Sequence, residues 1–278
     1  MTGRQTPCEN GTMGATARLK GPRIVKAFLE RQGRAGEAAR RQIHLVSYPR
    51  SGNTLMRRYL SILQGRAQQS AYADDVIDAA TVALTRELDG FDIVKSHQLP
   101  DDEKDLIYIL RDGRNATLSF LYMNFLAGGH SFSRPNQTWD AIRQLDEQEG
   151  SWSEHVAIIL RQWQERRILF LRYEDLIANP QAEIIRIAGF LGRALSEETI
   201  ARCLEMERDL ESYAGNPLNG YLYEPPPGTI YDLLKRNRTG DYWRHIFDDR
   251  RRRHFHERGG TEALMHFGYE RSSDWWQT

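Results

Sequence analysis

One stretch near the start of the chain constrains the fold most, the residues IHLVSYPRSGNTLMRRYL at positions 43–60. An apolar run typical of a buried strand ends at Tyr48 and Pro49, and hydrophobic residues then recur at helical spacing from Leu55 onward. A short polar segment, residues 49–54, separates the two patterns. The stretch therefore predicts a β-strand, a tight loop and an α-helix.

The loop between strand and helix has the composition of an anion-binding site. Pro49 cannot extend the strand, and Gly52 can adopt backbone angles closed to other residues. The N–H groups of a helix N-terminus attract anions, and side-chain donors stand beside them: Arg50, Ser51, Asn53 and Thr54. The segment is not a Walker A loop, because it lacks the second Gly and the Lys of that motif. An ordinary strand–turn–helix remains the alternative for the loop taken alone.

Three later apolar runs predict further strands, at 91–95, 105–110 and 168–173. Unbroken apolar runs between helical patterns are typical of a parallel sheet that is buried on both faces. Helical patterns lie at 115–125, 153–166 and 179–191, residues 74–88 are helical or irregular, and Ser196 is typical of the cap of another helix. The first three strands end beside Pro49, His97 and Arg111, at the edge where open α/β sheets bind ligands.

Composition limits the class of protein. The 278 residues, 40% of them hydrophobic, suit one globular domain. We expect residues 1–21 to be a disordered tail and residues 22–278 to form that single domain. Net charge is zero, so no global field favours nucleic acid or an anionic membrane. Two cysteines, no signal-peptide core and no apolar run near the length of a membrane span predict a cytoplasmic protein. The oligomeric state stays open, a homodimer included.

Two further segments complete a pattern with the loop: VKSHQLP at 94–100 and RDGRNATLS at 111–119. The loop resembles the YPKSGTTW motif of the sulfotransferases that use 3′-phosphoadenosine 5′-phosphosulfate (PAPS). The second segment resembles that family's KTHLP segment, and the third resembles its 3′-phosphate motif. The resemblance spans residues 43–243. It implies an α/β, P-loop-like three-layer fold with a central parallel sheet flanked by helices, and a cytosolic-type small-molecule sulfotransferase that releases PAP and needs no metal. The arginine-rich, lysine-poor composition suggests a bacterial source.

The resemblance also implies roles for the residues that transfer the sulfuryl group. The loop residues Arg50, Ser51, Gly52, Asn53 and Thr54 would hold the 5′-phosphosulfate. Lys95 and Arg50 would stabilise the leaving oxygen, although Arg50 replaces the usual Lys and is a poorer proton donor. His97 would be the general base, since the pKa of histidine lies near neutrality. A carboxylate such as Asp146 is the alternative base.

The same resemblance implies how the nucleotide is held. Arg111 and Ser119 would bind the 3′-phosphate through a charge-assisted contact and a hydroxyl. Tyr173 matches a tyrosine that approaches the adenine, whereas Leu55 replaces the Trp that commonly stacks on it. A partial match of residues 235–243 to RKGxxGDW adds three donor-binding residues: Lys235, Arg236 and Asn237. The alternative for residues 111–119 is a surface ion pair of Asp112 with Arg114 on an ordinary turn.

The acceptor is less defined. Aromatic residues in the predicted lids, 121–150 and 213–234, favour a small lipophilic or aromatic acceptor that offers a hydroxyl, or less favourably an amine. Two other classes remain as rivals: an ATP-dependent small-molecule kinase, which needs a Walker Lys, and a non-catalytic nucleotide-binding module. We expect the arginine run 250–253 to be a solvated helix face. The pair Trp275 and Trp276 is either a packed tail or an oligomer contact.

Overall fold

The computed structural model describes residues 40–64, 69–70, 87–88, 90–127, 142–143, 145–147, 149–212 and 243–277. All of them belong to the unit Glu37–Thr278. The predicted tail at 1–21, the second lid at 213–234 and the segment 235–242 lie outside the described residues. So do most of the first lid and the segment 74–88, apart from its last two residues.

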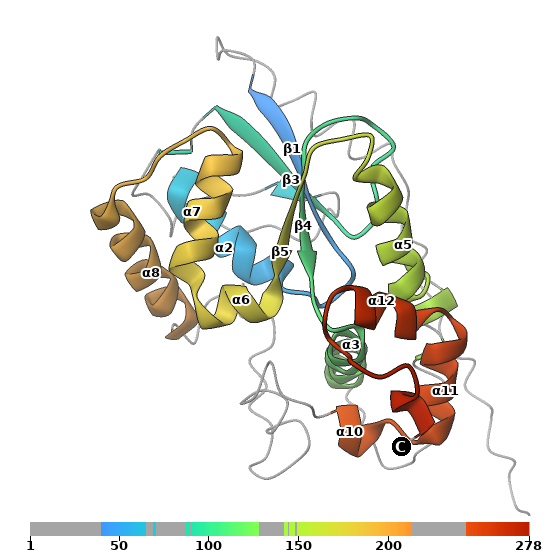
Figure 1. Ribbon diagram of the computed structural model, residues 1–278. Coiled ribbons are helices and arrows are strands. Elements are labelled where there is room, and N and C mark those ends of the chain that lie inside the picture. The colour runs from blue at the N-terminus through green and yellow to red at the C-terminus, as the bar shows by residue number, and fades with distance from the viewer. Residues whose placement is uncertain are drawn as a thin grey trace, which may run out of the picture. The chain divides into compact units, whose positions relative to one another are not determined.

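Five parallel strands form one sheet in the order β2-β3-β1-β4-β5. The central strand β1 (Arg41–Ser47) lies between β3 (Phe91–Ser96) and β4 (Leu106–Leu110), with β5 (Ile168–Arg172) beyond β4 (Figure 1). These four strands were predicted and are confirmed. The edge strand β2 (Gln69–Ser70) was not predicted, because two polar residues carry no apolar pattern.

Strand side chains alternate between the two faces of the sheet and so build two cores. On β4, Ile107 and Ile109 belong to one core, whereas Leu106, Tyr108 and Leu110 belong to the other. Every one of these side chains is buried. Both faces are therefore covered, as the unbroken apolar runs predicted.

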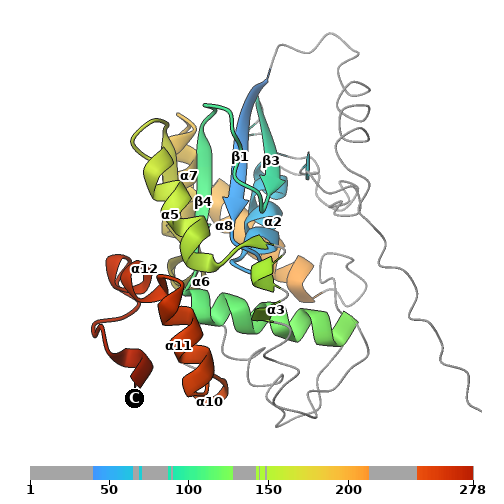
Figure 2. The same cartoon turned by 90° about the vertical axis from the view of Figure 1, so that its right-hand side faces the viewer.

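Helices cover each face of the sheet (Figures 1 and 2). One face carries α2 (Asn53–Gln64), α6 (Tyr173–Ala178), α7 (Pro180–Phe190) and α8 (Glu197–Ser212). The other face carries α3 (Gly113–Ala127), α5 (Trp152–Gln162), α10 (Trp243–Ile246), α11 (Asp249–Glu257), α12 (Gly260–His266) and the short 3₁₀ helix η3 (Trp275–Gln277). The predicted three-layer α/β fold is confirmed.

Capping residues explain where several helices begin. Ser151 and Glu154 form a capping box at α5, with Ser151 Oγ accepting from the Glu154 N–H at 3.2 Å. Asn179 caps α7 ahead of Pro180, and Ser196 Oγ accepts from the Thr199 N–H at the start of α8. Those two helix starts were predicted. In contrast, α5 ends at residue 162 rather than 166, and Tyr173 begins α6 instead of ending a strand.

The C-terminal helices correct one prediction and settle another. Arg250 and Arg253 are exposed, as expected of a solvated face, but Arg251 is buried and pairs with Asp248. The prediction was wrong for Arg251 because its position on α11 faces the core, where the carboxylate of the N-cap balances its charge. Trp275 is also buried, with its ring 5.2 Å from that of Trp243, so this tryptophan is part of a packed tail.

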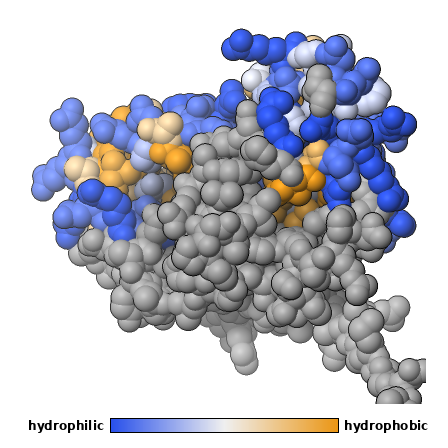
Figure 3. Space-filling view, turned by 90° about the horizontal axis from the view of Figure 1, so that it is seen from below, coloured by the Kyte–Doolittle hydropathy of each residue, from blue (hydrophilic) through white to orange (hydrophobic). Residues whose placement is uncertain are grey.

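The described surface is largely hydrophilic when the molecule is seen from below, and hydrophobic residues come to the surface there in two areas (Figure 3). Among the helices in the described part of the chain, we find none with the length and apolar character that a bilayer crossing requires.

Candidate active site

The three predicted motifs meet at one edge of the sheet. Strands β1, β3 and β4 are neighbours and parallel, so their carboxyl ends lie together (Figure 1). The loop 48–54 follows β1, His97 follows β3, and Arg111 follows β4. The structure thus brings together residues that lie up to 63 positions apart in the sequence, at the usual ligand-binding edge.

The loop has a strained backbone that other residues hold in place. Arg50 has φ of 67°, a left-handed conformation that is uncommon for a residue with a Cβ atom. Its carbonyl oxygen accepts a hydrogen bond of 2.8 Å from Arg111 Nη1, and the Ser51 N–H donates to Tyr48 O at 3.2 Å. Backbone strain of this kind often lies at functional sites, where the surrounding structure sustains it.

Side chains of the loop, β4 and α3 touch one another directly. Arg50 Nε donates to Ser119 Oγ at 3.2 Å. The Arg111 guanidinium lies 4.4 Å above the centre of the Tyr173 ring. That ring also lies against Gly52, where an added Cβ would be 2.5 Å from Tyr173 Cδ2. Two guanidinium groups, one hydroxyl and one aromatic ring therefore form a single cluster.

The electrostatics of this cluster favour a bound anion. The helices α2 and α3 both begin there, and neither has an acidic residue in its first turn. Helix N-termini carry partial positive charge, which adds to that of Arg50 and Arg111. Ser51 Oγ is fully buried and has no hydrogen-bond partner among the described residues. A buried hydroxyl without a partner is costly, and an anion oxygen would satisfy it.

The remaining residues of the loop either stabilise its conformation or face outward. Asn53 Nδ2 donates to Ser47 Oγ at 2.7 Å, which ties the first turn of α2 back to the end of β1. Thr54 is exposed at the second position of α2, and Leu55 is buried in the core. Lys235, Arg236 and Asn237 lie outside the described residues.

His97 is oriented by a hydrogen bond from its ring. Its Nδ1 lies 2.9 Å from Ser47 O, and a carbonyl oxygen can only accept. Nδ1 therefore carries the proton, and in the neutral ring Nε2 carries the lone pair. The main-chain oxygen of His97 accepts from His155 Nε2 at 2.8 Å. A base with a defined lone pair thus stands at the end of β3.

Lys95 lies two residues before His97 and is buried. Alternation on β3 puts it on the same face as Phe91 and Ile93. Burial raises the pKa of the Glu149 carboxyl, and the positive charge of Lys95 partly offsets this rise. The charge of Lys95 is therefore felt at Glu149, in the segment that leads into α5.

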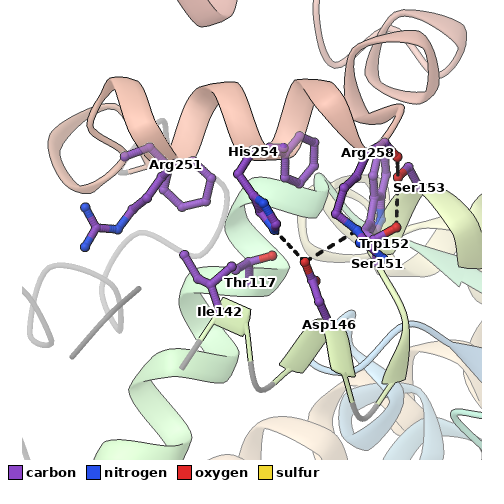
Figure 4. Close-up of a pocket in the computed structure, with 11 residues that line it drawn as sticks. Thr117, Ile142, Asp146, Ser151, Trp152, Ser153, Arg251, His254 and Arg258 are labelled. Carbon is purple, nitrogen blue, oxygen red and sulfur yellow. Dashed lines mark hydrogen bonds and ion pairs between the residues drawn. The ribbon is translucent and has the colours of Figure 1, made fainter. Parts of the chain in front are cut away.

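Asp146, the alternative base, is held elsewhere. Its Oδ2 accepts from His254 Nε2 at 2.7 Å and lies 3.6 Å from Arg258 Nε (Figure 4). The cavity beside it has a volume of about 20 Å³, room for about one water molecule, and His97 is not among its lining residues. The carboxylate of Asp146 thus binds side chains of the C-terminal helices.

The Asp112–Arg114 pair exists, but it is not a surface pair. Arg114 is 1% exposed, and its Nη2 donates to Asp112 Oδ2 at 2.7 Å. Its Nη1 donates to Glu270 Oε2 at 2.8 Å, and its guanidinium lies 3.9 Å from the centre of the Trp243 ring. The surface alternative is wrong because the C-terminal residues cover this turn. They thereby hold the chain immediately after Arg111.

Two residues of the site were missed by sequence reasoning. Ser47 accepts from His97 through its carbonyl and from Asn53 through its hydroxyl. His155 supports the main chain of His97 from α5. No local signal marks either one, since Ser47 ends an apolar strand and His155 lies in an amphipathic helix.

Comparisons with known proteins agree with this arrangement. The model of the sulfotransferase domain matches residues 40–266. Sulfotransferase 1A1 of Mus musculus is 30% identical over 182 residues, which is 59% of this chain and 60% of that protein. Sulfotransferase 1E1 of Homo sapiens is 25% identical over 229 residues, covering 73% of this chain and 77% of that protein.

Solved structures resemble the fold. The crystal structure of mouse sulfotransferase SULT7A1 complexed with PAP matches with a TM-score of 0.57 and 20% identity, covering 82% of this chain and 86% of that one. Retinol dehydratase in complex with androsterone and the inactive cofactor PAP matches with a TM-score of 0.52 and 18% identity, covering 80% of each chain.

Proposed function

Since this chain belongs to the sulfotransferase family, we propose that it transfers the sulfuryl group of PAPS to a hydroxyl of a small molecule and releases PAP. The observation that carries the proposal is the meeting of the loop 48–54, His97 and Arg111 at one edge of the sheet. The comparisons support the donor, because mouse SULT7A1 and retinol dehydratase were both solved with PAP.

The cluster around Arg50 provides the donor site. The hydroxyl of Ser51, the glycine at 52 and the N-terminus of α2 hold the 5′-phosphosulfate. Arg111 and Ser119 hold the 3′-phosphate, and Tyr173 lies beside Arg111 at the adenine side. The hydrogen bond of 3.2 Å from Arg50 Nε to Ser119 Oγ supports this arrangement, because it joins the loop directly to α3. Roles for Lys235, Arg236 and Asn237 stay predictions.

Residues at the strand ends perform the transfer. His97 Nε2 accepts the proton of the acceptor hydroxyl while the oxygen of that hydroxyl forms a bond to sulfur. The bond between sulfur and the leaving phosphate oxygen breaks at the same time. Lys95 and Arg50 stabilise the negative charge that grows on this leaving oxygen. Lys95 is the better proton donor of the two, because a guanidinium holds its proton too strongly.

The acceptor is a small lipophilic or aromatic molecule. Support comes from the aromatic residues of the predicted lids, and retinol dehydratase was solved with androsterone and with retinol. A cytoplasmic location is part of the proposal, based on the two cysteines of the chain. A homodimer remains one of the open states.

Calorimetric titration with PAP tests the donor site. We expect micromolar binding to the wild type, no comparable binding of ATP with magnesium, and a loss of at least about tenfold for Arg111→Ala, since a charge-assisted contact to phosphate is removed. Arg167→Ala is the matched control, because Arg167 lies at the amino end of β5, where it pairs with Asp105. Equal binding of ATP, or equal losses in the two variants, would refute the proposed donor site.

A further inference from the structure

His155 contacts residues that lie on, or directly after, the three strands that build the site. From α5, its buried ring donates through Nε2 to the main-chain oxygen of His97 at 2.8 Å, and its Nδ1 lies 2.8 Å from the hydroxyl of Tyr108 on β4. The ring also makes an edge contact with Tyr48, the residue that opens the anion loop after β1, at a centroid distance of 5.8 Å. One side chain thus touches the first residue of the loop, the main chain of His97 and Tyr108 of the neighbouring strand β4.

The hydrogen bonds define which atoms of Tyr108 and His155 carry protons. The carbonyl of His97 can only accept, so His155 carries its proton on Nε2. Its Nδ1 is then an acceptor, and Tyr108 is the donor. Burial lowers the pKa of His155, so the ring is neutral, and burial raises the pKa of Tyr108, so the phenol keeps its proton. The order of donation is Tyr108 to His155 to His97.

His97 is therefore held at two points. Its main-chain oxygen accepts from His155, and its ring Nδ1 donates to Ser47 O. Ser47 immediately precedes the loop, so the second bond fixes the ring relative to the anion site. The first bond fixes the backbone immediately after β3, one residue beyond the pair Val46 and Ser96 that ends the register with β1.

We propose that His155 is a positioning residue for sulfuryl transfer, which sets the place of the His97 ring relative to the loop 48–54. The proposal rests on the base role proposed above for His97. A displacement of a reacting group by about 1 Å can cost about 100-fold in rate. His155 acts through the main chain of His97 and through Tyr48.

Three variants separate positioning from simple packing. His155→Gln keeps both bonds, because an amide offers an N–H for the carbonyl of His97 and an oxygen for Tyr108. His155→Leu removes both and leaves the buried hydroxyl of Tyr108 without its acceptor, which destabilises the protein. Adding Tyr108→Phe to His155→Leu removes that hydroxyl, so the double variant regains stability while the support of His97 stays absent.

The first measurement is long-range ¹H–¹⁵N NMR of the histidine rings, with and without PAP, in which His97→Gln assigns the His97 signals. We expect wild-type His97 to be protonated on Nδ1 and His155 on Nε2. His155→Gln keeps the His97 tautomer. His155→Leu and the double variant lose it, because the ring no longer has a single position. This measurement requires no acceptor.

The second measurement is PAPS-dependent sulfation of 2-naphthol, with PAP affinity and the thermal midpoint as companions. We expect the rate to fall about 10- to 100-fold in His155→Leu and in the double variant, with PAP affinity unchanged. The double variant regains its thermal midpoint but not its rate.

Two results would overturn the proposal. One is an unchanged His97 tautomer in His155→Leu, and the other is a rate that recovers together with stability in the double variant. If the wild type failed to bind PAP, the proposed function would fall, yet the tautomer of His97 in the PAP-free protein would still decide the positioning role.

Discussion

Replacing Gly52 by alanine tests how tightly the proposed donor-binding loop, residues 48–54, is packed. Gly52 has φ of +107°, and a Cβ there would lie 2.5 Å from Tyr173 Cδ2. Real Cβ atoms do not approach so closely, so the ring must move by roughly 1 Å to reach ordinary contact. The ring cannot move easily, because Tyr173 is 6% exposed and lies beneath Arg111.

The expected cost has two parts that a matched control separates. Gly90 has nearly the same φ, +101°, but among the described residues a Cβ there would meet only Arg193 Nη2, at 3.5 Å. Gly90→Ala therefore measures the backbone part, about 1–2 kcal/mol. Gly52→Ala adds an overpacking part of about 1–3 kcal/mol. We expect urea unfolding to show that difference, and PAP affinity to fall about tenfold or more in Gly52→Ala alone.

A second background localises the clash. In Tyr173→Ala the ring is absent, so adding Gly52→Ala should cost no more stability than Gly90→Ala does. The reasoning is refuted if Gly52→Ala and Gly90→Ala lose equal stability, or if Gly52→Ala costs as much without the ring as with it.

Two further predictions concern charged groups around the site and at the opposite edge of the sheet. Arg114→Met leaves the carboxylates of Asp112 and Glu270 without their buried cation, so we expect about 3–5 kcal/mol less unfolding free energy in urea; a loss below about 1 kcal/mol would contradict the role of this pair. Burial alone would raise the pKa of Asp102, but hydrogen bonds led by that from Lys104 hold it at about 2. The stability that the ionised Asp102 carboxylate adds to the folded protein is complete above the ordinary carboxyl pKa and is lost as pH falls toward 2. Because the side chain is partly exposed, we expect wild type to lose only about 1 kcal/mol more than Asp102→Asn between pH 5 and pH 2, and parallel pH profiles would refute this.

The fold was largely predictable because most of its strands have a clear apolar sequence pattern. Runs such as Leu106–Leu110 are apolar at every position, which only a sheet covered on both faces requires. The elements that were missed are short: for example, β2 has two residues, α6 has six and α12 has seven. None of these is long enough for a periodic pattern to appear, so tertiary contacts decide their conformation.

The site was predictable only where its residues lie in local motifs. Arg111 and Ser119 could be named because they stand in one segment, eight positions apart. His155 could not, since its partners lie 58 and 47 positions away and nothing in its own helix marks it. The burial of Arg251 was missed for a related reason: the four-arginine run hides which position faces the core.

The buried position of Arg114 has a consequence for the order in which this protein can form. Arg114 stands three residues after Arg111, but its partners Tyr269 and Glu270 follow 155 and 156 positions later. During synthesis, strand β5 and the helices from α5 to α12 are made before the last partners of the turn that carries Arg111. Contacts of such long range form late in folding. The turn proposed to bind the donor is thus among the last parts of the nascent chain to gain its full support. A chain cut ahead of Tyr269 would keep the described residues of the proposed donor site yet lack that support.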